Sequence, residues 1–327
     1  MRAVRRILVA VNEPQARSQP AILKAAQLAR AWQAGLHLFH AHSAPLVADP
    51  YAVGPNFKDQ KRSVERSMAA RLEVLAERLR RHGLVVTTDA EWDFPAHEAI
   101  VRAARRAKAD LIVAQCHAGR HRLPWLMRLT DWELVRLSPM PVLLVKNRFG
   151  YHHPTILAAL DPSHAMDKPA SLDRLIMDVA GATKQVLRGR LHVVHAYSSY
   201  PMAPMMPDGV AAVDIDAIEK QVRRVAERRF RHSLRNSRLP LARRHLVAGH
   251  PIDVIAATAR KIRSAVVVMG AISRSGLHNL LIGNTAERIL DELGCDILVV
   301  KPRTFHSRVA RAVRGARLMP PPTPLFA

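Results

Sequence analysis

Short apolar stretches alternate with longer amphipathic ones along the chain. Runs rich in Val, Ile and Leu predict buried strands, and the intervening segments repeat apolar residues with the period of helices. Strands are expected at about residues 6–12, 36–42, 84–89, 110–115 and 141–146, and again at about 155–161, 191–197, 243–248, 265–270 and 296–301. Strands that alternate with helices in this way are typical of a parallel sheet covered by helices on both faces.

The two halves of the chain repeat one pattern. Residues 109–146 align on residues 264–301 without a gap, and the apolar positions coincide although few residues are identical. The same comparison places ILVAVNEP, from Ile7, on ILAALDPS, from Ile156. The repeat predicts two tandem doubly wound α/β domains, each with a five-stranded parallel sheet, over residues 1–150 and 151–303. We expect the two to pack as an internal pseudo-dimer.

The sequence also predicts where two helices begin and where a ligand would bind. Thr130 with Glu133, and Asn284 with Glu287, form capping-box pairs that predict the start of a helix before the last strand of each half. In doubly wound sheets ligands bind beyond the carboxyl ends of the strands, where the strand order reverses. Functional residues are therefore expected in the loops that follow strands.

Composition limits the location. No apolar run approaches the roughly 18 residues of a membrane-spanning helix, and the apolar stretch near the amino terminus is too short for a signal peptide. Cys116 and Cys295 are the only two cysteines, which favours a reducing compartment over a disulfide framework. A cytoplasmic protein without a transmembrane segment is expected.

The chain is strongly basic, with a net charge of +23. This charge favours contact with polyanions but supplies no sequence readout, so no specific nucleic-acid partner is expected. The composition of residues 304–327 predicts a flexible, Pro-rich tail. Alternatively, the spacing of its arginines would place them in a stripe on a short helix that contacts an anionic surface. The arginines that follow Lys301 are Arg303, Arg308, Arg311, Arg314 and Arg317.

A glycine-containing loop in the second half is the clearest candidate for ligand binding. Gly270 ends a predicted strand and is followed by Ser273 and Gly276, and then Gly283, Asn284 and Thr285 open a helix. Glycine lets backbone amides approach a phosphate, and the free N–H groups of a helix start attract anions. The plain alternative is that these glycines only form turns.

The spacing of this loop, G-x2-S-x9-G-N, resembles the ATP loop of the universal stress proteins, G-x2-G-x9-G-(S/T). The strings LTDWELVRLSPMPVLLVK and LIGNTAERILDELGCDILVVKP resemble the tandem, E-type members in particular. The resemblance implies a stress-linked, non-enzymatic binding protein with ATP in its second domain. It also places Asp161 and the run Gly249-His250-Pro251 at the nucleotide, and leaves open a homodimer of the whole chain.

The first half departs from this pattern. Gln115 stands at the position of Gly270, Arg128 at that of Gly283 and Asn12 at that of Asp161, so no ATP is expected there. Its loop carries thiol and imidazole groups, which suit zinc, and two further histidines end the second strand at the same edge. The weak candidate ligands are Cys116, His117, His121, His40 and His42. Coincidence among 17 histidines is the simpler interpretation.

Two other functions stay open. The connections 43–57 and 198–212 are rich in Pro and apolar residues, the second with Met202, Met205 and Met206, which favours either burial between the halves or a carrier of a hydrophobic or nucleotide-linked lipid ligand. A weak ATPase would need a base, for which His250 is the candidate.

Overall fold

The computed structural model describes residues 4–43, 46–47, 57–116, 124–162, 170–198, 215–271, 273–274, 281–282, 292–315 and 318–319. The chain forms two compact units. The first domain comprises residues 2–151 together with 305–327, and the second comprises residues 152–304.

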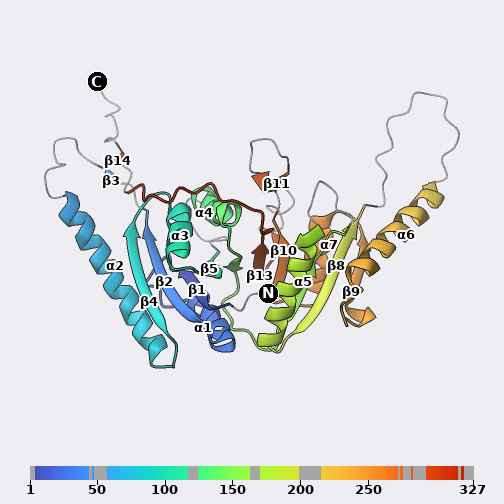
Figure 1. The fold of residues 1–327 in the computed structure, drawn as a ribbon, viewed down its shortest axis with the longest axis horizontal. Coiled ribbons are helices and arrows are strands. Elements are labelled where there is room, and N and C mark those ends of the chain that lie inside the picture. Colours follow the sequence, from blue (N-terminus) through green and yellow to red (C-terminus); the bar gives the residue numbers. More distant parts are fainter. Residues whose placement is uncertain are drawn as a thin grey trace, which may run out of the picture. The chain divides into compact units, whose positions relative to one another are not determined.

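The first domain is a parallel sheet with helices between successive strands (Figure 1). Its sheet has the strand order β4-β2-β1-β5-β6, so the chain moves outward from β1 on one side and then returns to the other. The elements are β1 (Arg6–Ala10), α1 (Pro20–Trp32), β2 (Gly35–His42), β3 (Leu46–Val47), α2 (Phe57–Arg80), β4 (Val86–Trp92), α3 (Ala96–Arg106), β5 (Leu111–Gln115), α4 (Pro124–Leu137) and β6 (Val142–Val145).

The second domain repeats this order as β13-β10-β7-β8-β9, in which β7 takes the place of β1. Two short strands, β11 and β12, form an antiparallel pair after β10. The elements are β7 (Thr155–Ala159), α5 (Ala170–Val186), β8 (Arg190–Tyr197), α6 (Ile215–Ser233), a 3-10 turn (Leu241–Arg243), β9 (Arg244–Ala248), α7 (Pro251–Lys261), β10 (Val266–Gly270), β11 (Ser273–Arg274), β12 (Leu281–Ile282) and β13 (Asp296–Val300). The helix expected after Asn284 lies outside the described residues.

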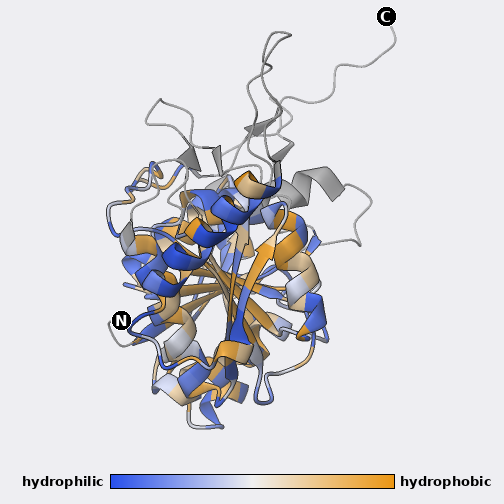
Figure 2. Cartoon of the chain, turned by 90° about the vertical axis from the view of Figure 1, so that its right-hand side faces the viewer, coloured by the Kyte–Doolittle hydropathy of each residue, from blue (hydrophilic) through white to orange (hydrophobic). Residues whose placement is uncertain are grey.

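The central strands are buried because helices cover both faces of each sheet. β7 and β13 are buried along their whole length, and β1 and β10 are buried at four of five positions. Figure 2 shows the strands in the colour of hydrophobic residues and the outer helix faces in that of hydrophilic ones. The prediction of tandem doubly wound domains is confirmed.

Two local predictions differ from the structure. Strand β4, which was predicted at about residues 84–89, begins at Val86 and continues to Trp92, three residues past its predicted end. Helix α4 begins at Pro124, so Thr130 lies inside the helix and does not cap it. Proline is favoured in the first turn of a helix because its missing N–H has no partner there in any case.

The C-terminal segment departs from the flexible tail that the sequence predicts. Residues 305–315 lie on the first domain, and β14 (Leu318–Met319) pairs in parallel with β3. The described residues from 304 to 315 contain no helix, so the helical arginine stripe is wrong for this part of the chain. Gly315 has a φ of +78°, a backbone conformation that other residues rarely adopt.

Among the described residues, no helix combines the length and the apolar character needed to cross a membrane.

Candidate functional site

The strand order of the second domain reverses between β7 and β10, and two of the predicted site residues lie there. Asp161 follows β7 after one intervening residue, and Gly270 is the last residue of β10. The two strands are parallel neighbours, with Val268 paired to Ala158, so both residues lie at the carboxyl edge of the sheet. This is the position at which doubly wound folds bind ligands.

The carboxyl edge is extended by the loop that leads from β9 into α7. Gly249 donates its N–H to the carbonyl of Tyr197 over 2.9 Å and has a φ of +140°, which favours glycine. His250 is the N-cap residue of α7, and its exposed side chain makes no capping hydrogen bond. Pro251 opens the helix, so the described side chains leave the free N–H groups of the first turn available to an anion.

Gly270 also has a packing role. A Cβ atom added there would lie 2.7 Å from Cδ2 of Leu172 and 3.3 Å from Cδ1 of Ile176, both buried side chains of α5. Contacts this short require a neighbour to shift, so glycine permits the close approach of α5 to β10. The space that a side chain at position 270 would occupy is therefore filled by α5.

Asp161 is held at its backbone. Its N–H donates to Oδ1 of Asp173, a buried residue of α5, over 3.2 Å. The Asp161 residue is half-buried, which leaves part of it accessible at the edge. An accessible carboxylate at this place can accept hydrogen bonds from the hydroxyl or amino groups of a ligand.

The rest of the predicted phosphate loop is described in part. Ser273 lies in β11 and pairs with Ile282 of β12, so the loop folds back as a short hairpin after Gly270. Gly276, Gly283, Asn284 and Thr285 lie outside the described residues, and their part in the site stays a prediction.

The matching edge of the first domain has different chemistry. Asn12 follows β1 and Gln115 ends β5, where the second domain has Asp161 and Gly270. Gln115 is half-buried, and no glycine opens the end of the strand. This edge therefore lacks both the carboxylate and the glycine that characterise the second domain.

The histidines predicted as metal ligands have other partners where the structure describes them. His40 is buried and donates Nδ1–H to the carbonyl of Val11 over 2.7 Å, and His42 packs edge-on against Trp92 with ring centroids 4.7 Å apart. Burial lowers the pKa of both imidazoles. No group of three or more metal-binding side chains occurs among the described residues; His117 and His121 lie outside them.

A comparison of the domains explains His40. His195 occupies the matching place in β8 and its Nδ1 lies 3.2 Å from the carbonyl of Leu160, which follows β7. In each domain, a histidine at the corresponding position therefore forms a hydrogen bond with the carbonyl of the residue that follows the central strand. His40 and His195 are 155 residues apart, the offset at which residues 109–146 align on residues 264–301.

The first domain also contains a buried ionic cluster that the sequence did not predict. Asp93, which directly follows β4, is fully buried and accepts hydrogen bonds from Nε and Nη2 of Arg102 at 3.1 and 2.5 Å. Nη1 of Arg102 donates to Glu98 over 3.0 Å. Asp and Arg nine residues apart give no sequence signal by themselves, because only the strand-to-helix turn brings them together.

The universal stress protein family model matches residues 3–146 and 154–301. The chain belongs to this family. It is 28% identical to universal stress protein E of Escherichia coli over 233 residues, which cover 69% of this chain and 72% of that protein. It is 25% identical to universal stress protein E of Photorhabdus laumondii over 243 residues, covering 70% and 73%.

Solved structures agree with the family assignment. A putative universal stress protein from Pseudomonas aeruginosa has a TM-score of 0.71 and 27% identity, with 92% of this chain and 94% of the other covered. A universal stress protein from Archaeoglobus fulgidus shares the fold at a TM-score of 0.55 and 15% identity. The resemblance to tandem, E-type universal stress proteins is thereby confirmed.

Proposed function

We propose that the second domain binds ATP at its carboxyl edge and that the chain acts in the stress response as a regulatory binding protein without turnover. The observation that carries this proposal is that Asp161 and Gly270 follow the two neighbouring strands at the strand-order reversal of the second domain, with Gly249 at the same carboxyl edge after β9. The carboxylate suits the hydroxyl and amino groups of a nucleoside, and Gly249, with its positive φ at the turn before α7, lets phosphates approach the backbone.

The start of α7 supports the same assignment. Its free N–H groups and helix dipole favour negative charge, and phosphate groups are typical ligands of such a helix start. The N-terminus of α7 directly follows Gly249, whose positive φ turns the chain into the helix. A ligand with a polar nucleoside at one end and phosphates at the other matches this distribution of groups.

The two domains provide a matched test by calorimetric titration of the full chain with ATP. We expect Asp161→Ala to weaken ATP binding about tenfold or more, because a hydrogen bond to a charged group contributes roughly 1.5–3 kcal/mol. Asn12→Ala, the matching change in the first domain, should leave the affinity unchanged. No saturable ATP binding by the unaltered protein, or equal affinity of the Asp161→Ala variant, would contradict the proposal.

Turnover is measured on the same samples as release of inorganic phosphate. We expect none, since His250 is exposed and no acid–base pair accompanies it among the described residues of this edge. Sustained release that His250→Ala abolishes would replace a binding protein with an ATPase.

A further inference from the structure

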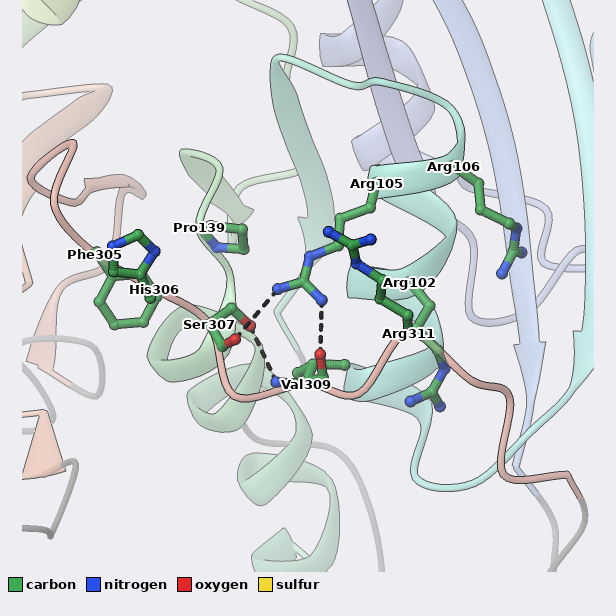
Figure 3. A pocket seen from close by; sticks show the side chains of 9 residues that line it. All are labelled: Arg102, Arg105, Arg106, Pro139, Phe305, His306, Ser307, Val309 and Arg311. Carbon is green, nitrogen blue, oxygen red and sulfur yellow. Dashed lines mark hydrogen bonds between the residues drawn. The ribbon is translucent and has the colours of Figure 1, made fainter.

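The C-terminal segment, defined here as residues 305–315, is fastened to helix α3 at two places. Near the end of α3, Nη1 of Arg105 donates to the carbonyl of Val309 over 2.7 Å and Nη2 donates to that of Ser307 over 3.4 Å (Figure 3). Near the start of α3, Oδ1 of Asp93 accepts the N–H groups of Arg314 and Gly315 at 3.2 and 2.9 Å. The segment thus runs antiparallel to α3.

Charge and apolar contact strengthen this docking. Nε of Arg314 lies 3.2 Å from Glu98, which also pairs with Arg102, and the N–H of Phe94 donates to the carbonyl of Gly315 over 3.2 Å. The apolar residue Val309 is buried, with only 5% of its surface exposed. The hydrogen bonds at both ends fix the segment along the helix instead of leaving it as a solvated tail.

Between the segment and α3 lies a pocket of about 730 Å³. Three arginines of α3 form one wall, and Phe305, His306 and Arg311 contribute to the other (Figure 3). Pro139, Val309 and the ring of Phe305 supply apolar surface. The volume falls within the roughly 300–1,000 Å³ of small-molecule sites, so a ligand larger than a single ion can enter.

The charges around the pocket do not balance. Arg102 is paired with Asp93 and Glu98, and Arg106 is paired with Glu91 and Asp89. In contrast, Arg105 and Arg311 face no carboxylate within the described part of the chain. Two positive charges are therefore left over.

The remaining two guanidinium groups are close enough to repel each other. Burial, Arg311 and then Arg102 lower the pKa of Arg105, as expected for a cation that is partly desolvated beside other cations. The carbonyls of Ser307 and Val309 take two of the five N–H donors of Arg105, which leaves three for another acceptor. An anion between Arg105 and Arg311 would remove the repulsion and use these donors.

We propose that this pocket binds a small organic phosphate, with the dianionic phosphate between Arg105 and Arg311 and an apolar or aromatic body against Phe305, Pro139 and Val309. Two unbalanced cations match a dianion, and guanidinium groups bind phosphate through paired hydrogen bonds. The site belongs to the first domain and is separate from the nucleotide site proposed for the second. The C-terminal segment supplies Arg311 and Phe305, so the site is complete only when the segment is docked.

Calorimetric titration of the full chain tests this with two probes of one shape, phenyl phosphate and phenyl sulfate, at about pH 8, where a phosphate monoester with a second pKa of about 6 carries two charges. We expect saturable binding of phenyl phosphate and binding of the monoanionic phenyl sulfate that is about tenfold weaker, since one charge-assisted contact is lost. Equal affinities for both probes, or no saturable binding of phenyl phosphate at millimolar concentration, would overturn the proposal.

Variants locate the binding. Arg311→Gln should weaken phenyl phosphate binding about tenfold, because it removes one of the two cations that hold the phosphate. The segment should stay docked in this variant, since Arg311 is exposed and makes no docking contact among the described residues. Arg30→Gln removes the same charge from the exposed end of α1, which does not line the pocket, and should change the affinity less than about twofold, as an exposed charge outside the pocket is screened. Equal loss in both variants would show a diffuse charge effect and overturn the site, whereas Asp161→Ala should have no effect, which separates this pocket from the nucleotide site.

Discussion

Helices α3 and α7 have the same length and the same place in the two domains, but within the described residues only α3 is covered by a C-terminal segment. Ala103 and Ala104 of α3 and Thr258 and Ala259 of α7 are buried against their sheets at matching positions. On the other face, Glu98 and Arg102 are buried in the first domain, whereas the matching Asp253 and Ala257 are exposed in the second. Residues 305–315 cover the ionic groups of α3, whereas the matching positions of α7 are exposed in the described part of the chain.

The loops before these helices differ in the same sense. Trp92 pairs with His42 as Ala248 pairs with Tyr197, so Asp93 and Gly249 each come directly after the strand. Asp93 is buried and binds Arg102 and the C-terminal segment; Gly249 turns the backbone toward the start of α7. Duplicated domains can thus diverge in the chemistry of a loop and a helix surface while the strand order stays unchanged.

The largest effect is expected from breaking the ionic interior that distinguishes the first domain. Arg102→Met leaves the buried Asp93 carboxylate without its cation, and breaking a buried pair in this way costs about 3–5 kcal/mol of unfolding free energy. Urea unfolding followed by tryptophan fluorescence measures it, because all four tryptophans, Trp32, Trp92, Trp125 and Trp132, belong to the first domain.

Arg106→Met is the matched control for this measurement. The side chains of Arg106 and Asp89 are 43% and 42% exposed and that of Glu91 is 21% exposed, so a smaller loss of about 1 kcal/mol is expected. Similar losses in the two variants would mean that the buried cluster contributes no more than a surface pair, and the contrast between α3 and α7 would lose its energetic basis.

An intermediate effect is expected where the second domain depends on glycine. Gly270→Ala places a Cβ atom 2.7 Å from Leu172, and such overpacking costs about 1–3 kcal/mol. Hydrogen exchange in peptides that cover β10 and α5 should therefore become faster by about tenfold, since 1.4 kcal/mol corresponds to a factor of ten.

Gln115→Ala is the corresponding change in the first domain. Gln115 is half-buried, and its replacement shortens a side chain instead of adding one, so exchange in β5 should change little. Unchanged protection of β10 in the Gly270→Ala variant would show that α5 can move away, and the packing argument for this glycine would fail.

The smallest effect on stability is expected from His40, which corresponds to His195 of the second domain. Burial lowers the pKa of His40 below the ordinary value of 6.5, so the unfolded chain binds a proton more readily than the folded one. Stability of the first domain is then present above about pH 6.5 and lost as the pH falls, by up to about 1 kcal/mol between pH 7 and 5.5. Tryptophan-monitored urea unfolding at the two pH values measures the difference.

His40→Gln, which keeps a donor for the carbonyl of Val11, should reduce this acid sensitivity. His195→Gln is the control. His195 belongs to the second domain and all four tryptophans belong to the first, so this change should leave their pH response unchanged. An identical acid loss in the unaltered protein and the His40→Gln variant would assign the sensitivity to other histidines.

The sequence by itself determined the repeated fold. Apolar runs and helical periods are local, so strands such as β1, β7 and β10 were predictable to within one or two residues. Matching the strands of the two halves also identified Asp161 and Gly270 as the counterparts of Asn12 and Gln115. Errors arose at ends, as at Thr130, where a capping pattern also fits the interior of a helix that begins with proline.

Only the tertiary structure decided where the C-terminal segment lies and which charges it encloses. Arg314 and Gly315 meet Asp93 across more than two hundred residues of sequence, and no local pattern records a contact of that kind. Its basic, Pro-rich composition predicted a flexible tail, and burying a charge is unfavourable unless a partner compensates it. Asp93 and Glu98 provide those partners for Arg102 and Arg314, and the surplus charge of Arg105 and Arg311 follows from the same packing.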